Sequence, residues 1–193
     1  MNNPIVKRGE KVRFACQRSG KCCSSGPNVS LTAFDICRIS KFLGVNWTDL
    51  VGDKIYAVIA DYFAIPVLRG RNGRCVFLTR DKEGRPACSI YPARPMRCRL
   101  YPFIPVSPGN PNVLEISMNC PGVGKGPMID PPWRLLERYY EEVRLHYELL
   151  HKLVFEEGLS PIEALERAVD MACKGWPRAD LLDLDELEAL ENT

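Results

Sequence analysis

The amino-acid sequence predicts an α+β fold: an irregular, proline-rich cysteine-cluster region with short strands and helices, followed by a C-terminal helical hairpin. Eleven of the 16 prolines lie in residues 86–132, where they remove backbone donors and interrupt helices. Nine cysteines are present, mostly in segments of weak periodicity. After Asp130, apolar residues recur at helical spacing. We expect a cysteine-rich region over 1–129 and a hairpin with an acidic tail over 130–193, packed together as one globular unit.

The composition is that of an ordinary globular protein. Hydrophobic residues make up 46% of the 193 residues and charged residues 26%, which permits a real core. No apolar run reaches the roughly 18 residues that a membrane helix needs. The N-terminal stretch lacks the apolar segment of a signal peptide. These features predict a cytoplasmic protein that has no membrane partner.

The net charge of +2 is the difference between two unlike halves. Residues 1–110 hold 18 Lys and Arg against 7 Asp and Glu, a net +11, whereas residues 111–193 hold 8 against 17, a net −9. Two interpretations stay open. Either the halves attract each other within one fold, or the basic half binds a partner.

The first regular elements lie between residues 30 and 70. "SLTAFDICRISKFLG" predicts a helix capped by Thr32, with Asp35 three residues later and Gly44 as its stop. "NWTDLVGDKI" predicts a shorter helix with Asn46 as its cap. "IYAVIADYFAIPVLRG" is compatible with helix or strand, and its β-branched residues, aromatic residues and Pro66 favour strand in the second half.

The next segment predicts a β-hairpin. In "RCVFLTRDKEGRPACSIY" the polar turn "DKEG" would place Cys75 and Cys88 on opposite arms. One further strand is expected in "NVLEISMNC", leading into Cys120. A segment this rich in proline needs additional stabilising interactions to become ordered, and metal–thiolate bonds can supply them.

A long helix is predicted after residue 129. Asp130 would cap it and Pro131 would take its first position, with Gly158 ending it. The spacing of its apolar residues predicts one buried face, formed by Leu136, Tyr140, Val143, Tyr147, Leu150 and Val154.

A second helix should complete the hairpin. In "SPIEALERAVDMACK", Ser160 and Glu163 form a capping box around Pro161. Its predicted buried stripe is Ile162, Leu165, Val169 and Ala172. The tail "ADLLDLDELEALENT" carries six acids and no base, which is typical of a short amphipathic helix or a frayed end.

The nine cysteines divide into two classes. Cys37 and Cys173 lie inside helical patterns and are expected to be small buried hydrophobic residues. A disulfide framework is not expected, because cytosolic thiols stay reduced and the number is odd. The other seven lie near Gly, Pro or Arg in weakly periodic segments and are the candidate metal ligands: Cys16, Cys22, Cys23, Cys75, Cys88, Cys98 and Cys120.

Thiolates bind zinc, copper(I) and the iron of iron–sulfur clusters. Structural zinc usually shows paired C-x2-4-C knuckles, which this chain lacks. Adjacent cysteines suit a larger object or two neighbouring sites, which favours an iron–sulfur cluster, 4Fe-4S above all, with zinc as the alternative. His146 and His151 are five residues apart and face different sides of a helix, so paired histidine ligation is not expected.

The order of several motifs is more specific. It runs from "FAC" at Phe14 through "GKCC", "LTAFDICRISKFLG", "CVFL" and "CSIYPARPMRCRLYPF" to "CPG" at Cys120. This order resembles the YkgJ-type cysteine-cluster family, the putative zinc- or iron-chelating domain, over about residues 12 to 124. The resemblance implies an iron–sulfur-cluster-containing protein related to the domain in flagellin lysine N-methylases.

This sequence departs from the family pattern at its first cysteines. The family often spaces them C-x3-C-x2-C-C, whereas here Cys16 is followed by Gln17, Arg18, Ser19 and Gly20. One cysteine of the pattern is therefore missing or displaced. The resemblance implies a metal site far more firmly than a reaction.

Arg94, Arg97 and Arg99 surround Cys98 and are the candidate cofactor-binding residues. They could compensate a negatively charged thiolate cluster or seat an anionic group, or they could pair with the acidic helices. Two functions stay open. One is a redox or methyl-transfer role for one or two iron–sulfur clusters; the other is a zinc module without catalysis.

The partner remains open as well. An unknown small molecule or protein is expected. Nucleic acid is a weaker alternative, which would use aromatic side chains for stacking on a basic face. The available aromatic residues are Phe77, Tyr91, Tyr101 and Phe103.

Overall fold

The computed structural model describes residues 3–24 and 29–191 of the chain. It contains both helices and short strands, which confirms the α+β class. The helical elements are α1 (Lys21–Ser24), α2 (Ala33–Leu43), η1 (Trp47–Leu50), η2 (Tyr91–Ala93), α3 (Met96–Leu100), α4 (Trp133–His151), the π-helical turn η3 (Lys152–Glu156), α5 (Pro161–Cys173), η4 (Ala179–Leu182) and α6 (Leu184–Glu191).

The strands are short and form small antiparallel sheets. They are β1 (Ile5–Lys7), β2 (Val12–Phe14), β3 (Ile55–Ala60), β4 (Phe63–Leu68), β5 (Gly70–Arg71), β6 (Arg74–Cys75), β7 (Leu78–Arg80), β8 (Pro86–Cys88), β9 (Phe103–Pro105), β10 (Val113–Ile116) and β11 (Val123–Ile129). Among the described residues they make one three-stranded sheet, β1-β10-β9, and the pairs β2–β11, β3–β4, β5–β6 and β7–β8.

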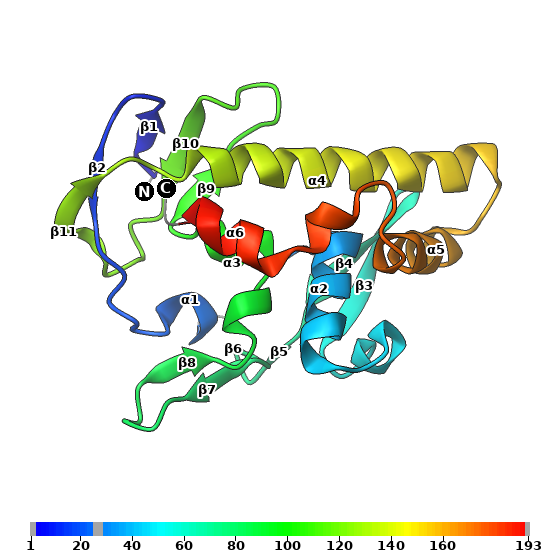
Figure 1. The fold of residues 1–193 in the computed structure, drawn as a ribbon, viewed down its shortest axis with the longest axis horizontal. Coiled ribbons are helices and arrows are strands. Elements are labelled where there is room, and N and C mark those ends of the chain that lie inside the picture. The colour runs from blue at the N-terminus through cyan, green and yellow to red at the C-terminus, as the bar shows by residue number, and fades with distance from the viewer. Residues whose placement is uncertain (1–2, 25–28, 192–193) are drawn as a thin grey trace.

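Helix α4 runs along the molecule and contributes to two hydrophobic cores (Figure 1). Its N-terminal half packs with the three-stranded sheet, α3 and α6, around residues such as Leu100, Leu114 and Leu136. Its C-terminal half packs with α2, the β3–β4 hairpin and α5, around residues such as Ile39 and Leu150. The cysteine-bearing segments at the lower edge of Figure 1 attach to these two cores.

Several predicted caps are confirmed. Thr32 and Asp35 form a full capping box on α2, and Gly44 ends that helix in the left-handed conformation. Asn46 and Asp49 cap η1 in the same way. The sequence "IYAVIADYFAIPVL" is strand in both halves, joined by a tight turn at Asp61 with φ of +53°.

The start of α4 differs from the prediction. The helix begins at Trp133 rather than at Pro131, and its cap is Pro132, which makes no side-chain hydrogen bond. Asp130 instead follows β11 and forms an ion pair with Lys11, 3.4 Å away. The pairing of β11 with β2 extends through Ile129, so the helix cannot begin there.

The predicted buried face of α4 is confirmed only in part. Leu136 and Leu150 are buried, but Tyr140, Val143 and Val154 are only half-buried and Tyr147 is exposed. The buried face is rotated around the helix and includes Arg138, Glu142 and His146, besides apolar residues. Apolar spacing alone missed this face because three of its members are polar.

The buried polar residues form a network of hydrogen bonds and ion pairs, although the Nε atoms of Arg38 and Arg138 have no hydrogen-bond partner among the described residues. Arg38, fully buried in α2, donates to both carboxylate oxygens of Glu142 at 2.7 and 2.8 Å, and to Asp35 at 2.6 Å. It also donates to the backbone carbonyl of Leu181. His146 Nδ1 accepts the backbone N–H of Ala33 at the start of α2. These contacts join α2 to α4 and to the C-terminal segment.

Helix α5 carries a slightly different stripe from the predicted one. Leu165, Val169 and Ala172 are buried as expected, whereas Ile162 is 40% exposed. The capping box of Ser160 and Glu163 is confirmed. In the tail, η4 and α6 are helical.

Cys37 and Cys173 form a disulfide, with Cα atoms 5.3 Å apart. The expectation that both are simply small buried hydrophobic residues was therefore wrong. Cys37 is buried and Cys173 is half-buried, and the packing of α2 against α5 brings their sulfur atoms together. The bond ties α2 to α5 across 136 residues of sequence.

Charge attraction within the fold is visible in the ion pairs. Arg8 pairs with Glu137, Arg38 with Glu142, and Arg94 with Glu191, each joining the basic half of the sequence to the acidic half. Among the described residues, no helix is long and apolar enough to cross a membrane.

Candidate metal centre

Helix α1 carries the adjacent cysteines. Their Sγ atoms lie 3.7 Å apart, and the hydrogen bond from the Cys23 thiol lowers the pKa of Cys22 to about 6. The same hydrogen bond, together with burial, raises the pKa of Cys23. Cys22 also lies close enough to Arg94 to be stabilised as a thiolate.

Close packing places α1 beside the β7–β8 hairpin. Gly20 immediately precedes α1 and has φ of +67°. A Cβ atom at this glycine would lie 2.4 Å from the Cβ of Pro86, so only glycine permits this approach to β8. The turn therefore holds Cys22 and Cys23 near the strand that ends at Cys88.

Cys75 and Cys88 lie on two different hairpins, which corrects the prediction of opposite arms on one. Cys75 pairs with Gly70 in the hairpin β5–β6, and Cys88 pairs with Leu78 in β7–β8. The missed signal is the turn at Asn72-Gly73, where both residues have positive φ, as a type I′ turn requires.

Burial raises the pKa of both these thiols, while backbone N–H groups oppose the effect. Phe77 and Leu78 supply these groups to Cys75, and Ile90 supplies one to Cys88. Charge on either thiol would repel charge on the other and on Cys22. The two hairpins thus bring their cysteines into one electrostatic neighbourhood with α1.

Cys98 is held from the core side by α3. Burial raises its pKa, and the nearby Cys75, Asp35 and Cys88 raise it further. Asp35 accepts the backbone N–H of Met96 at 3.0 Å, which anchors the first turn of α3 to α2. The core thereby positions Cys98 against the thiols of the two hairpins.

Cys16 and Cys120 form a second group, at the pairing of β2 with β11. Ala15 donates its N–H to the carbonyl of Gly122, and a Cβ on Gly122 would lie 2.4 Å from the carbonyl oxygen of Ala15. Cys16 follows Ala15 directly, and Cys120 is two residues before Gly122. This strand pair brings two cysteines 104 positions apart in sequence to neighbouring places.

Tyr101 lies between the two groups. Burial raises the pKa of its hydroxyl, and so does the proximity of Cys120 and Cys22. The hydroxyl is 3.3 Å from the Oγ of Ser117. Nothing in the sequence distinguished Tyr101 from the other tyrosines as a residue linking the cysteines.

Figure 1 shows the segments that carry the two groups, with β2 and β11 at one end and α1 near the short hairpins below. Within residues 3–24 and 29–191, no three Cys, His, Asp or Glu side chains already converge on one point closely enough to hold a metal ion. The donor chemistry nevertheless fits a thiolate-bound metal. Seven thiols are free of disulfide bonds, and five of them interact electrostatically from α1, β6, β8 and α3.

The three candidate arginines have partners within the protein. Arg94 pairs with Glu191 of α6 and lies over the ring of Tyr91, 3.7 Å from its centroid. Arg99 pairs with the same Glu191, and the charge of Arg97 acts on Tyr139, whose pKa it lowers against the effect of burial. Arg94 also acts on the thiols, since its charge favours the thiolate forms of Cys22 and Cys88.

A family model described as CxxCxxCC, the putative zinc- or iron-chelating domain, matches residues 15–121, more than half of the chain. The chain belongs to this zinc- or iron-chelating family. The match begins one residue before Cys16 and ends one residue after Cys120, so it spans all seven free cysteines. Metal binding by this region is therefore supported by the family as well as by the donor set.

A relative is also found among known proteins. The chain is 29% identical over 178 residues to an uncharacterized protein of Methanocaldococcus jannaschii, and the alignment covers 88% of this chain and 87% of the archaeal protein. That similarity extends over the helical C-terminal part. No solved structure matches the chain.

The family's pattern locates the missing cysteine. The spacing in the family model, C-x2-C-x2-C-C, corrects the C-x3-C-x2-C-C expected from the resemblance. Laid on the chain from Cys16, it places its last two cysteines at Cys22 and Cys23 and its second at Ser19. The departure expected from the sequence is thus a replacement by serine in unchanged spacing. Ser19 is exposed, and its Oγ accepts the backbone N–H of Lys21 at 3.3 Å.

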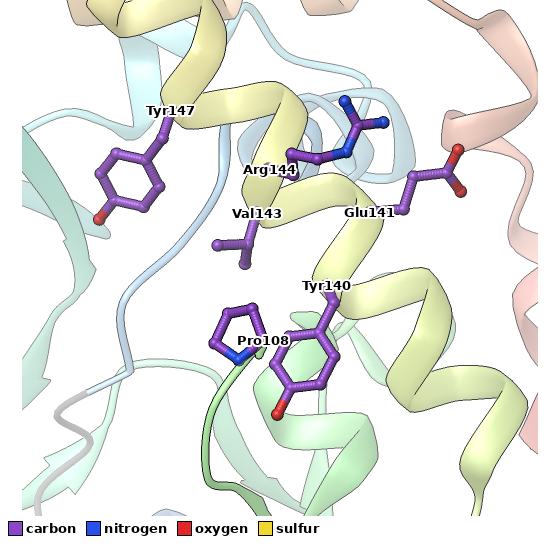
Figure 2. Close-up of a pocket in the computed structure, with 6 residues that line it drawn as sticks. All are labelled: Pro108, Tyr140, Glu141, Val143, Arg144 and Tyr147. Atoms are coloured by element: carbon purple, nitrogen blue, oxygen red, sulfur yellow. The ribbon is translucent and has the colours of Figure 1, made fainter. Parts of the chain in front are cut away.

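A cavity of about 400 Å³ lies elsewhere, on the side of α4. Figure 2 shows Tyr140, Val143 and Tyr147 projecting from the helix, with Pro108 next to Tyr140. Tyr140, Val143 and Tyr147 belong to the helix face that was predicted to be buried, so the cavity lies where the sequence predicted a packed face. It contains no cysteine among its lining residues.

The aromatic residues proposed for nucleic-acid stacking do not form an exposed platform. Phe77 and Phe103 are each 4% exposed and belong to the two cores. Tyr91 is exposed, but Arg94 lies over its ring.

Proposed function

We propose that this protein binds an iron–sulfur cluster, with 4Fe-4S favoured, on its free cysteine thiolates. The observation that carries the proposal is that the family model spans all seven free cysteines, five of which, on α1, β6, β8 and α3, influence one another electrostatically. The proposed ligands of the first group are drawn from Cys22, Cys23, Cys75, Cys88 and Cys98. Cys16 and Cys120 are proposed as ligands of a second site beside it.

A bound cluster would supply electron transfer or an iron at which a small molecule reacts, which suits a redox or methyl-transfer role. The chain's own residues would tune such a centre. Backbone N–H groups at Cys75 and Cys88 point to the sulfur atoms and stabilise negative charge there. Arg94 adds a positive charge close to Cys22 and Cys88 and is proposed as the cofactor-facing arginine.

Zinc is the second candidate because of one distance. Two thiolates bound to the same tetrahedral zinc at about 2.3 Å lie roughly 3.8 Å from each other. The Sγ atoms of Cys22 and Cys23 are 3.7 Å apart. This spacing suits two ligands on one metal ion and favours a zinc module that acts through structure rather than catalysis.

We propose a cytoplasmic location, since seven thiols must stay reduced to bind metal. The proposal also treats residues 1–129 and 130–193 as one unit, with the acidic helices neutralising arginines near Cys98 through Glu191.

Metal analysis of anaerobically purified protein tests the function directly. The proposal expects iron together with acid-labile sulfide. Zinc without sulfide would support the structural module instead. Protein that is folded yet binds neither metal, even after reconstitution with iron and sulfide or with zinc, would refute both functions.

A further inference from the structure

Ser19 occupies the place of a ligand. It stands at the second cysteine of the family pattern, three residues after Cys16 and three before Cys22, with no change in spacing. A serine hydroxyl is a far poorer ligand than a thiolate for zinc or for cluster iron. The chain therefore retains seven candidate thiolates where the pattern, together with Cys75, Cys88, Cys98 and Cys120, would give eight.

The turn that carries Ser19 lies between the two thiol groups. On one side Cys16 and Cys120 are brought together by the β2–β11 pair. On the other, Gly20 is pressed against Pro86 of the β7–β8 hairpin. Ser19 thus sits where the chain passes from one group to the other, close to the segment of Cys22 and Cys23.

The number of protein ligands per metal determines the consequence of having serine instead of cysteine at position 19. Iron in a cubane cluster and tetrahedral zinc both complete a set with four protein ligands. Eight thiolates could complete two such sets, whereas seven complete one and leave three. A metal with three protein ligands keeps a position open to solvent or to an added ligand.

We propose that replacement of a cysteine by Ser19 leaves one metal of this protein with an open coordination position that binds a small anionic ligand. This inference rests on the proposed metal binding. A small ligand can reach this position from solvent, because Ser19 and Cys16 are both exposed. Anionic ligands are favoured because residues 1–110, which carry Ser19 and most of the free cysteines, have a net charge of +11.

Ser19 has a simpler role in the structure, as the acceptor for the N–H of Lys21. The variants must separate that role from ligation. Ser19→Cys restores the pattern and supplies an eighth thiol. Ser19→Ala removes the hydrogen bond and adds no ligand. Ser24→Cys, at the exposed end of α1, is the matched control, because it adds a thiol to the same segment outside the pattern.

X-ray absorption at the edge of the bound metal, with and without cyanide as the probe, tests the proposal under anaerobic conditions. Wild type, Ser19→Ala and Ser24→Cys should each show a light-atom ligand beside sulfur and should take up cyanide. Ser19→Cys should show more sulfur per metal and no response to cyanide.

Three results would overturn the open position. Ser19→Cys could respond to cyanide as the wild type does. Wild type could show sulfur ligands alone and ignore cyanide. Cyanide could bind Ser19→Ala but not wild type, which would make the Ser19 oxygen itself the ligand. Absence of metal from folded wild type is a different failure, since it refutes the proposed function itself.

Discussion

At the scale of single residues, the buried polar side chains of α4 decide how that helix sits. Arg138, Glu142 and His146 lie on its buried face, where apolar spacing predicts none of them. The fold supplies hydrogen-bond partners that allow this burial: Arg38 donates to Glu142, and the N–H of Ala33 donates to His146. Partners of this kind come from distant segments, so the sequence of the helix alone does not reveal them.

Arg38→Met should lower the free energy of unfolding by about 3–5 kcal/mol, because Asp35 and Glu142 would stay buried without their countercharge. Urea unfolding measures the difference. Arg144→Met is the matched control, since it breaks an exposed ion pair with Glu148 and should cost less than about 1 kcal/mol. Equal losses in both variants would mean that the Arg38 network contributes no more than a surface pair.

Stability should fall in mild acid because of His146. Burial lowers its pKa from 6.5 to about 4, while the nearby charge of Asp35 opposes this. Below pH 6.5 the unfolded chain binds a proton at this residue that the folded chain refuses, so the stabilisation present at neutral pH is lost as the pH falls towards 4. The unfolding free energy should drop by about 1.4 kcal/mol between pH 7.5 and 5.5 from this residue.

His146→Gln isolates that contribution, because its amide oxygen can still accept the N–H of Ala33. The groups facing His146 are Asp35 and Tyr147, and both remain in the variant. The difference in unfolding free energy between wild type and variant should shrink on going from pH 7.5 to 5.5. A difference that stays constant over this range would contradict the account.

At the scale of elements, local signals predicted more than long-range ones. The capping boxes at Thr32 and Ser160 and the cap at Asn46 depend on residues at most three apart, and all three formed as expected. Strands β1, β2 and β11 pair with segments far away in sequence and have little alternation of their own, so the sequence did not reveal them. The prediction placed Cys75 on the wrong hairpin, because it did not use the Asn72-Gly73 turn that joins β5 to β6.

The candidate metal centre follows the same rule. The seven cysteines could be singled out from their settings and from the resemblance, but their division into two groups depends on the β2–β11 pairing and on the Gly20–Pro86 contact. Cys37 is buried as predicted, whereas Cys173 is only half-buried. That α2 and α5 pack against each other, and so allow a disulfide, is a property of the tertiary fold.

The disulfide should stabilise the α2–α5 contact without serving the metal. Because it closes a loop of more than a hundred residues, Cys37→Ala should cost about 3–5 kcal/mol in the free energy of unfolding, with bound metal unchanged in the folded protein. Urea unfolding with and without a phosphine reductant checks this. The reductant should bring wild type down to the variant and leave the variant unaffected; no effect on wild type would count against the bond.

At the scale of the whole molecule, the two cores and the cysteine segments have different sources of stability. The cores are built from α2, α4, α5 and the larger strands, and they bury most of the apolar side chains. Residues 86–132 hold eleven prolines and only short elements. Met96, Leu100 and Leu114 of this span are core residues, so we expect metal to order the cysteine-bearing segments between them rather than the whole span.

Removal of metal should increase amide hydrogen exchange in the cysteine-bearing segments of residues 86–132 and leave α5 and the C-terminal half of α4 protected. Mass spectrometry of peptides from chelator-treated and metal-loaded protein measures this. Helix α5 serves as the internal control, since its contacts are with α2, α4 and β4. Equal protection of both regions in both states would contradict the idea that metal orders these segments.

The central claim is that the seven free cysteines bind metal and the two disulfide cysteines do not. Metal per folded chain, measured after anaerobic purification of Cys98→Ser and Cys37→Ala, tests it most directly. Cys98 lies among the thiols of α1 and the two hairpins, so Cys98→Ser should lose most of the bound metal. Cys37→Ala should retain the wild-type amount. Equal metal loss in the two variants, or full retention in Cys98→Ser, would contradict the account.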